Sequence, residues 1–188
     1  MYKICKTQES IKRQHSFEIS LLNLMKTTSY KSISITDLCK EVGISRKNFY
    51  RYFTNKDDVL LALIDHTIQE YPKYIFPFPK TKEDIFTEME QYLSFWKSHR
   101  LLLDALFKNR LGSILVERVI RHAWRFDKSL LNTSSSLQEP NNVSFVISGI
   151  ITLVFLWHNK NYEPSESQLA TTICKLLSEP IFPIEDTR

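Results

Sequence analysis

The sequence predicts an all-α protein, and three observations support this fold class. A hydrophobic fraction of 43% with only 3 glycines and 7 prolines among 188 residues favours a packed, helix-rich chain. Capping residues precede several of the predicted helices. Apolar side chains also recur at i, i+4, i+7 and i+8, the spacing of one helix face, near both ends of the chain: Phe17, Leu21, Leu24 and Met25, and then Leu169, Ile173, Leu176 and Leu177.

Residues 34–56 predict two short helices joined by a tight turn. Ser34 and Asp37 form a capping box that starts the first helix, which runs to about Val42. Gly43 lies where a helix needs a left-handed residue to stop, and Ser45 caps the second helix. Two short helices with a glycine in the turn are typical of a helix-turn-helix unit, whose second helix fits the DNA major groove.

Four groups of residues in this region form one pattern: Ile33-Ser34, Gly43-Ile44-Ser45, the aromatic run Phe49-Tyr50-Arg51-Tyr52-Phe53, and Asn55-Lys56. The pattern resembles the DNA-binding unit of the TetR family of bacterial transcriptional regulators. The resemblance covers residues 15–64 most clearly and extends over residues 81–178. It implies an N-terminal three-helix helix-turn-helix DNA-binding domain at residues 1–56, a connecting helix to about residue 71, and a helical C-terminal ligand-binding, regulatory and dimerisation domain at residues 72–188.

The second helix of the unit carries most of the residues expected to meet DNA. Phe49 and Phe53 lie four residues apart and are expected to face the core. Asparagine pairs with adenine and lysine or arginine with guanine, whereas tyrosine hydroxyls hold phosphate oxygens. Lys56 matches the phosphate-contacting lysine of the similar family. The predicted DNA-binding residues are Ser34, Thr36, Ser45, Arg46, Lys47, Asn48, Tyr50, Arg51, Tyr52 and Lys56.

Two features of this set leave questions open. Core packing is the alternative interpretation for Tyr50 and Tyr52. Many members of the similar family carry a small residue at the position of Lys47 and threonine or serine at that of Asn48, so the resemblance does not give the operator sequence.

Positive charge gathers in the same part of the chain. Residues 1–56 hold 11 lysines and arginines against 4 acidic residues, and the remainder holds 14 against 17, although the net charge is only +4. This asymmetry is the electrostatic footprint of phosphate binding and predicts an affinity for double-stranded DNA that falls with salt. Lys3, Lys6, Lys12 and Arg13 reach a phosphate or the minor groove in one interpretation and form a solvated face in the other.

The rest of the chain predicts a connecting helix and a helical body. The connecting helix begins at the cap Asn55 and ends at Tyr71-Pro72, so the domain boundary is placed near residue 72. Thr81 and Asp84 form a capping box that starts the body. The helix that follows this cap has apolar residues at helical spacing from Ile85 to Trp96. Further helices are predicted over residues 99–109 and 113–131, with a break at Gly112 and a loop over residues 132–142.

Residues 143–158 are apolar nearly all round, so the helix that they predict must be buried on every side. It is too short for a membrane span, which needs roughly 20 apolar residues. We therefore expect one side to face the body and the other a partner subunit. This helix and the last one resemble the helices that form a four-helix dimer interface in the TetR family, which implies a homodimer. The predicted interface residues are Ile147, Ile150, Ile151, Val154, Trp157, Leu169, Ile173 and Leu176.

The body also carries large aromatic residues in the segments that form the ligand cavity of similar regulators. The resemblance implies a small-molecule effector pocket lined by Trp96, Phe107, His122, Trp124 and Phe145. Plain core packing is the alternative for the aromatic residues, and a helix-surface position is the alternative for His122. A basic face runs from Arg118 through Arg121 and Arg125 to Lys128; it favours an anionic effector or is simply solvated.

Two functions are compatible with these features. The first is a TetR-like, ligand-responsive repressor that binds a palindromic operator as a homodimer. The alternative is a helix-turn-helix co-regulator whose C-terminal domain binds a protein partner and not a small molecule.

Catalysis and export are not expected. The 5 histidines lack the spacing of a metal site, and the sequence has no Gly-rich phosphate loop or G-x-S-x-G motif, so neither an enzyme nor a cofactor is predicted. Cys5, Cys39 and Cys174 are odd in number and widely spaced, which favours buried thiols in a reducing cytoplasm over a thiol sensor. The polar N-terminal segment does not resemble a signal peptide.

Overall fold

The computed structural model describes residues 2–71, 82–130 and 140–178, apart from the side chains of residues 82, 124–130, 140, 142 and 143. In these ranges every regular element is a helix, which confirms the all-α fold class. The predicted cap Thr81 and most of the predicted loop over residues 132–142 lie outside the described residues.

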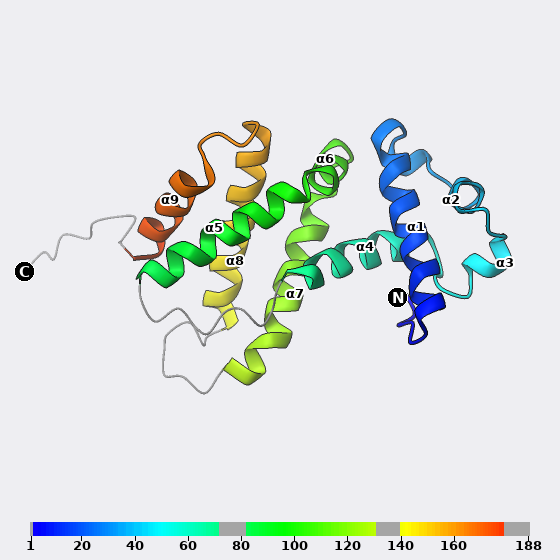
Figure 1. Ribbon diagram of the computed structural model, residues 1–188, viewed down its shortest axis with the longest axis horizontal. Coiled ribbons are helices and arrows are strands. Elements are labelled where there is room, and N and C mark those ends of the chain that lie inside the picture. The colour runs from blue at the N-terminus through cyan, green and yellow to red at the C-terminus, as the bar shows by residue number, and fades with distance from the viewer. Residues whose placement is uncertain (1, 72–81, 131–139, 179–188) are drawn as a thin grey trace, which may run out of the picture.

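The N-terminal helices form a compact head. Its elements are α1 (Gln8–Thr27), the short 3-10 helix η1 (Tyr30–Ser32), α2 (Ile35–Val42), α3 (Arg46–Phe49) and the start of α4 (Lys56–Glu70). α1 packs against both α2 and α4 (Figure 1). Phe17, Leu21 and Met25 are fully buried on the inner face of α1, as their spacing predicted. α1 therefore supports the helix-turn-helix unit from behind.

The caps that delimit the short helices are those predicted. The Ser34 amide donates to the Asp37 carboxylate at 2.9 Å, and the Asp37 amide donates to Ser34 Oγ at 3.2 Å, which completes the capping box. Gly43 has a φ of 70°, the left-handed conformation that ends α2. Ser45 Oγ and Asn55 Oδ1 accept the capping bonds of α3 and α4.

The body contains α5 (Lys82–Ser98), α6 (Arg100–Lys108), α7 (Gly112–Leu130), α8 (Pro140–Asn159) and α9 (Glu166–Ser178). α5 packs along α9, and α7 packs along α8. Two helices begin earlier than predicted. Gly112 is the first residue of α7 and not only a break, and its lack of a side chain makes room for the Phe155 ring, 3.3 Å from where a Cβ would lie. Pro140 opens α8, a position where its missing amide costs nothing.

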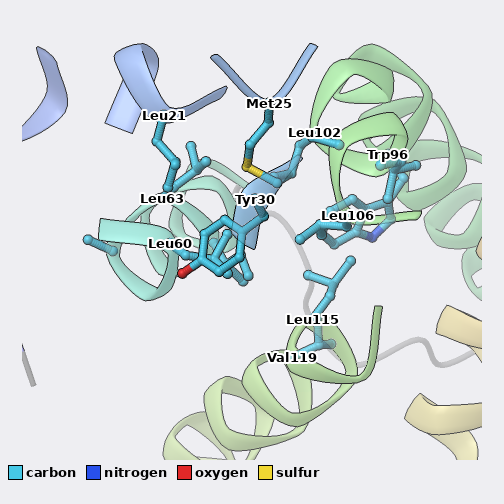
Figure 2. Packing of buried hydrophobic residues seen from close by; sticks show 14 of the residues in the cluster. Leu21, Met25, Tyr30, Leu60, Leu63, Trp96, Leu102, Leu106, Leu115 and Val119 are labelled. Carbon is cyan, nitrogen blue, oxygen red and sulfur yellow. The ribbon is translucent and has the colours of Figure 1, made fainter. Parts of the chain in front are cut away.

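α4 joins the head to the body. It packs against α1 on one side and against α7 on the other. Buried side chains from both halves form a single hydrophobic cluster, in which Leu21 and Met25 of α1 and Leu60 and Leu63 of α4 are followed by residues of α5, α6 and α7 (Figure 2). The head and the body therefore share one core.

The turn at Gly43 provides a test of the predicted stop signal. Gly43→Ala is expected to lower the free energy of unfolding by about 1–2 kcal/mol, the cost of a left-handed residue with a side chain. An added Cβ would meet no atom within 4 Å, so the cost lies in the backbone alone. Urea titration measures it. Gly43→Asn is the matched control, because asparagine tolerates this conformation, and equal losses in both variants would contradict the explanation.

Candidate nucleic-acid interface

An aromatic cluster fixes the position of α3. The ring of Phe17 meets the rings of Phe49 and Phe53 edge to face, with centroids 5.3 and 5.9 Å apart. All three side chains are buried, as predicted for Phe49 and Phe53. Because these rings hold one side of α3 against α1, the opposite side is turned to solvent.

The solvent side of α2 and α3 brings together most of the predicted DNA-binding residues. Arg46, Lys47, Tyr50 and Arg51 are exposed, and Asn48 is half-buried. The Arg46 guanidinium donates to the Tyr50 hydroxyl at 3.2 Å, so these two side chains lie together. Ser34, Thr36 and Ser45 are also exposed, although Ser34 and Ser45 use their hydroxyls as caps.

Two of the predicted DNA-binding residues, Tyr52 and Lys56, contact other parts of the protein. The ring of Tyr52 is half-buried, 6.5 Å from that of Phe17, which corresponds to the packing alternative. Lys56 Nζ donates to the carbonyl of Ile33 at 2.7 Å and to that of Tyr30, and it lies 4.3 Å from the centre of the Tyr30 ring. Two of the three N–H donors of the Lys56 ammonium are therefore already used by backbone carbonyls.

Residues at the end of α6, in the body, form hydrogen bonds to the segment that connects α1 to α2. The Tyr30 amide donates to Asn109 Oδ1 at 2.6 Å, and Lys108 Nζ donates to the carbonyl of Lys26 at 2.8 Å. The Tyr30 hydroxyl also donates to Asp57 at the start of α4. Tyr30, four residues before the cap Ser34 of the helix-turn-helix unit, is thus fixed by both α4 and the end of α6. Sequence patterns did not indicate this contact.

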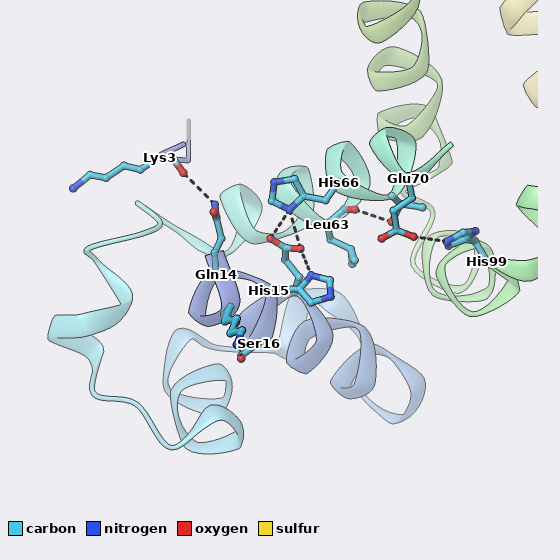
Figure 3. Close-up of polar contacts among 11 residues, drawn as sticks. Lys3, Gln14, His15, Ser16, Leu63, His66, Glu70 and His99 are labelled. Carbon is cyan, nitrogen blue, oxygen red and sulfur yellow. Dashed lines mark hydrogen bonds and ion pairs between the residues drawn. The ribbon is translucent and has the colours of Figure 1, made fainter. Parts of the chain in front are cut away.

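A buried carboxylate joins α1 to α4. The Glu18 side chain is fully enclosed, and His66 Nδ1 lies 2.9 and 3.1 Å from its two oxygens. His15 Nδ1 lies 3.1 Å from one of the same oxygens, and Figure 3 shows both histidine rings turned toward this carboxylate. At the other end of α4, His99 Nε2 lies 3.1 Å from Glu70. These ion pairs connect the head to α4 and α4 to the body.

The predicted effector-pocket residues differ in their surroundings. Trp96 is buried beside Tyr92 and Phe95, and Phe107 is half-buried against Phe155 with ring centres 4.7 Å apart. His122 is buried and lies 3.0 Å from Asp65, whereas Phe145 is 76% exposed. The Trp124 side chain lies outside the described residues.

The predicted basic face is partly engaged in ion pairs. Arg118 binds Asp65 with two nitrogens, and Arg121 lies 2.6 Å from Glu117. The side chains of Arg125 and Lys128 lie outside the described residues. Arg118 therefore does not offer an unpaired charge to an anionic ligand.

Over the described ranges, no group of acidic, histidine and cysteine side chains has the geometry of a metal site. Among the helices described, none combines the length and apolar character needed to cross a bilayer.

The capped α2, the left-handed turn and the supported α3 define a helix-turn-helix DNA-binding domain. A sequence model described as "Bacterial regulatory proteins, tetR family" matches residues 21–63, which spans this unit. The helix-turn-helix region of the chain is therefore similar to that of the TetR family, as the resemblance implied.

Named relatives share the same region. The transcriptional regulator EthR of Mycolicibacterium smegmatis is 50% identical over 46 residues, 24% of this chain and 21% of that protein. EthR of Mycobacterium tuberculosis is 44% identical over 48 residues, 26% of this chain and 22% of that protein. The match thus spans about a fifth of the length of these relatives. They are named as transcriptional regulators.

Solved structures resemble the whole described fold. The crystal structure of Lin0861 from Listeria innocua has a TM-score of 0.72 at 22% identity and covers 91% of this chain and 92% of that one. A tetR-family transcriptional regulator from Streptomyces coelicolor has a TM-score of 0.59 at 21% identity, covering 87% and 78%. At these identities the likeness concerns the fold alone, and it confirms a helix-turn-helix head followed by a helical body.

The buried pair of Glu18 and His66 predicts a pH dependence of stability. The hydrogen bond to Glu18, opposed by burial, raises the pKa of His66, and the charges of Asp65 and Glu70 act in the same direction. A raised pKa in the folded state gives stability that is complete below the unfolded value of about 6.5 and is lost as the pH rises through the folded value. His66→Gln is expected to remove this loss when thermal unfolding is followed from about pH 5 to about pH 9.

His158→Gln is the control for this experiment. Burial lowers the pKa of His158, so its contribution has the opposite sign and grows as the pH rises. If His66→Gln gave a pH profile parallel to that of the unaltered protein, Glu18 and His66 would not be coupled in the way described.

Proposed function

We propose that this protein is a transcriptional regulator that binds double-stranded DNA and reads its operator with α3. The observation that carries the proposal is the two-sided character of α3. Phe49 is buried against the head, while Arg46, Lys47 and Tyr50 project from the other side with side chains suited to bases and phosphates.

The charge of the head supports the same function. The lysines and arginines at residues 1–56 outnumber the acidic residues 11 to 4, whereas the rest of the chain has a slight acidic excess. Such a distribution attracts the head, and not the body, to the phosphate backbone. Selection of bound fragments from genomic DNA tests the function directly and gives the operator.

Lys47 is expected to determine sequence preference. Lys47→Ala should reduce discrimination at the base pair that it reads by about 1–3 kcal/mol, because a lysine contact to a guanine edge is lost. Competition binding with single-base variants of the selected operator measures this change. Lys160→Ala removes the same charge from an exposed position in the body and should leave base preference unaltered. A Lys47→Ala variant that loses affinity equally for all variants would show a phosphate contact instead.

We further propose that the protein acts as a homodimer through α8 and α9. The structure encloses most of the predicted interface within one subunit: Ile151, Val154, Trp157, Leu169 and Ile173 are buried. Ile147 and Ile150 are half-buried, and Leu176 is exposed. The sequence placed these residues at the interface because α8 is apolar on all sides, so its periodicity does not reveal which stripe faces the body of the same subunit.

Another stripe of α8 is available to a partner. Phe145, Gly149, Thr152 and Leu156 follow one another at i, i+4, i+7 and i+11, and all four are exposed. Phe145 is 76% and Leu156 52% exposed, and Leu176 and Leu177 of α9 are also large exposed apolar residues. Burial of such residues against a second copy favours association. A two-fold dimer would also present two α3 helices to a palindromic operator.

Leu156→Glu is expected to convert the dimer to a monomer without unfolding the chain. The side chain is half exposed in one subunit, so a carboxylate there remains hydrated until a partner covers it. Sedimentation velocity gives the oligomeric state, and circular dichroism verifies the fold. Leu101→Glu, at a 47% exposed leucine of α6, is the matched control. Dimers of undiminished affinity in Leu156→Glu would place the interface elsewhere.

The proposal extends to a ligand-responsive repressor. Trp96 and His122 are enclosed in the body and Phe107 is half-buried, so these three of the predicted pocket residues face its interior. An effector bound there alters DNA binding only if it has unequal affinity for two arrangements of the head, because equal affinity shifts no population. In this proposal the free protein holds the arrangement that occupies the operator.

A further inference from the structure

Asp65, in the middle of α4, is bound by side chains from two other parts of the chain. Its Oδ2 accepts a hydrogen bond of 2.7 Å from the Tyr2 hydroxyl and another from Arg118. Its Oδ1 accepts a 2.6 Å bond from Arg118 Nε and lies 3.0 Å from His122 Nε2. Arg118 and His122 belong to α7, so this carboxylate connects α4, α7 and the residues that precede α1.

The surroundings of Asp65 stabilise its ionised carboxylate. The residue is only 2% exposed, which disfavours a bare carboxylate, yet its two oxygens receive four contacts. Burial raises the pKa of Asp65, but the hydrogen bonds from His122, Arg118 and Tyr2 outweigh it and hold the pKa well below its usual range. Burial and the hydrogen bond to Asp65 raise the pKa of Tyr2, so its hydroxyl stays protonated and donates.

The residue after Tyr2 is bound to the DNA-binding head. The Lys3 amide donates to the carbonyl of Tyr52, just beyond α3, at 3.1 Å. The Lys3 carbonyl accepts a 3.1 Å bond from Gln14 Nε2, a buried side chain of α1 (Figure 3). The Tyr2 ring also packs edge to face on His66, with centroids 5.9 Å apart. One continuous series of bonds thus runs from Arg118 through Asp65, Tyr2 and Lys3 to Tyr52.

We propose that Tyr2 and Asp65 are positioning residues for DNA binding: together with Arg118 they fix the orientation of α3 relative to the body. This role rests on the proposed function. The hydrophobic core places α4 between α1 and α7, and it includes Phe49 at the C-terminal end of α3 and Phe53 just beyond it. The Tyr2–Lys3 segment supplies a directional connection there, since each hydrogen bond forms at one register only.

The consequence for affinity follows from conformational populations. Without the Tyr2 bond the head samples orientations that do not fit the operator, and binding must select the competent fraction, so apparent affinity falls in proportion. The folded core is retained because it does not depend on this hydroxyl. In this proposal, a shift of α7 in the body is transmitted to α3 through the same contiguous series of hydrogen bonds.

Tyr2→Phe tests the proposal, because it removes one hydroxyl and keeps the ring. The probe is a duplex selected from a random-sequence library by the unaltered protein. We expect the variant to bind this duplex about 5-fold or more weakly, within the usual range of coupling effects. Amide exchange followed by NMR should be faster at Lys3 and at Arg51 to Phe53, and unchanged in α9. Tyr162→Phe is the matched control, since its buried hydroxyl has no hydrogen-bond partner among the described residues.

A double-mutant cycle with Arg118→Lys separates positioning from a general loss of stability. If Tyr2 acts through Asp65 and Arg118, the loss caused by Tyr2→Phe should be smaller in the Arg118→Lys background. Equal DNA affinities of Tyr2→Phe and the unaltered protein would overturn the role of Tyr2. So would a double variant whose fold-loss of affinity equals the product of the losses in the two single variants. Failure of the unaltered protein to select any duplex would instead overturn the proposed function and this role with it.

Discussion

Burial of α4 on two sides is the constraint on which the rest of the structure depends. Val59, Leu60 and Ile64 are almost fully enclosed, and the helix contacts α1 in the head and α7 in the body. A helix that belongs to two cores at once cannot move in one without disturbing the other, because close-packed interiors have few alternative arrangements. The orientation of α3 is therefore a property of the whole chain and not of the first 56 residues alone.

The polar contacts along α4 add direction to this packing. Apolar surfaces tolerate small rotations, whereas the enclosed carboxylates of Glu18 and Asp65 are satisfied only when their partners on α4 and α7 lie in one position. Either carboxylate left without its partners in the interior would be strongly destabilising. The same residues that stabilise the fold thus limit the set of orientations available to the head.

The sequence predicted the local features of this architecture and few of its long-range contacts. Capping at Ser34, Ser45 and Asn55 and the stop at Gly43 involve residues within four positions of one another, so sequence spacing reveals them. The Asp65–Arg118 pair spans 53 residues, and no periodicity marks it. For the all-apolar α8, periodicity gave no basis for choosing between the buried stripe at Val154 and the exposed stripe at Leu156. The sequence placed Lys56 correctly at the start of α4, but the direction of its side chain depends on the carbonyl of Tyr30, 26 residues earlier.

The bonds from the Lys56 amine to backbone carbonyls have a consequence for how charge is counted in such proteins. Formal charge treats every lysine of residues 1–56 as equally able to displace counterions from DNA. Lys56, however, is coordinated by backbone carbonyls, burial lowers its pKa, and Arg13 is paired with Glu9 at 2.9 Å. The number of phosphates neutralised, which sets the slope of affinity against salt concentration, is therefore smaller than the number of basic residues. Two related proteins with identical formal charge can differ in ionic-strength response solely through how many of their cations are occupied internally.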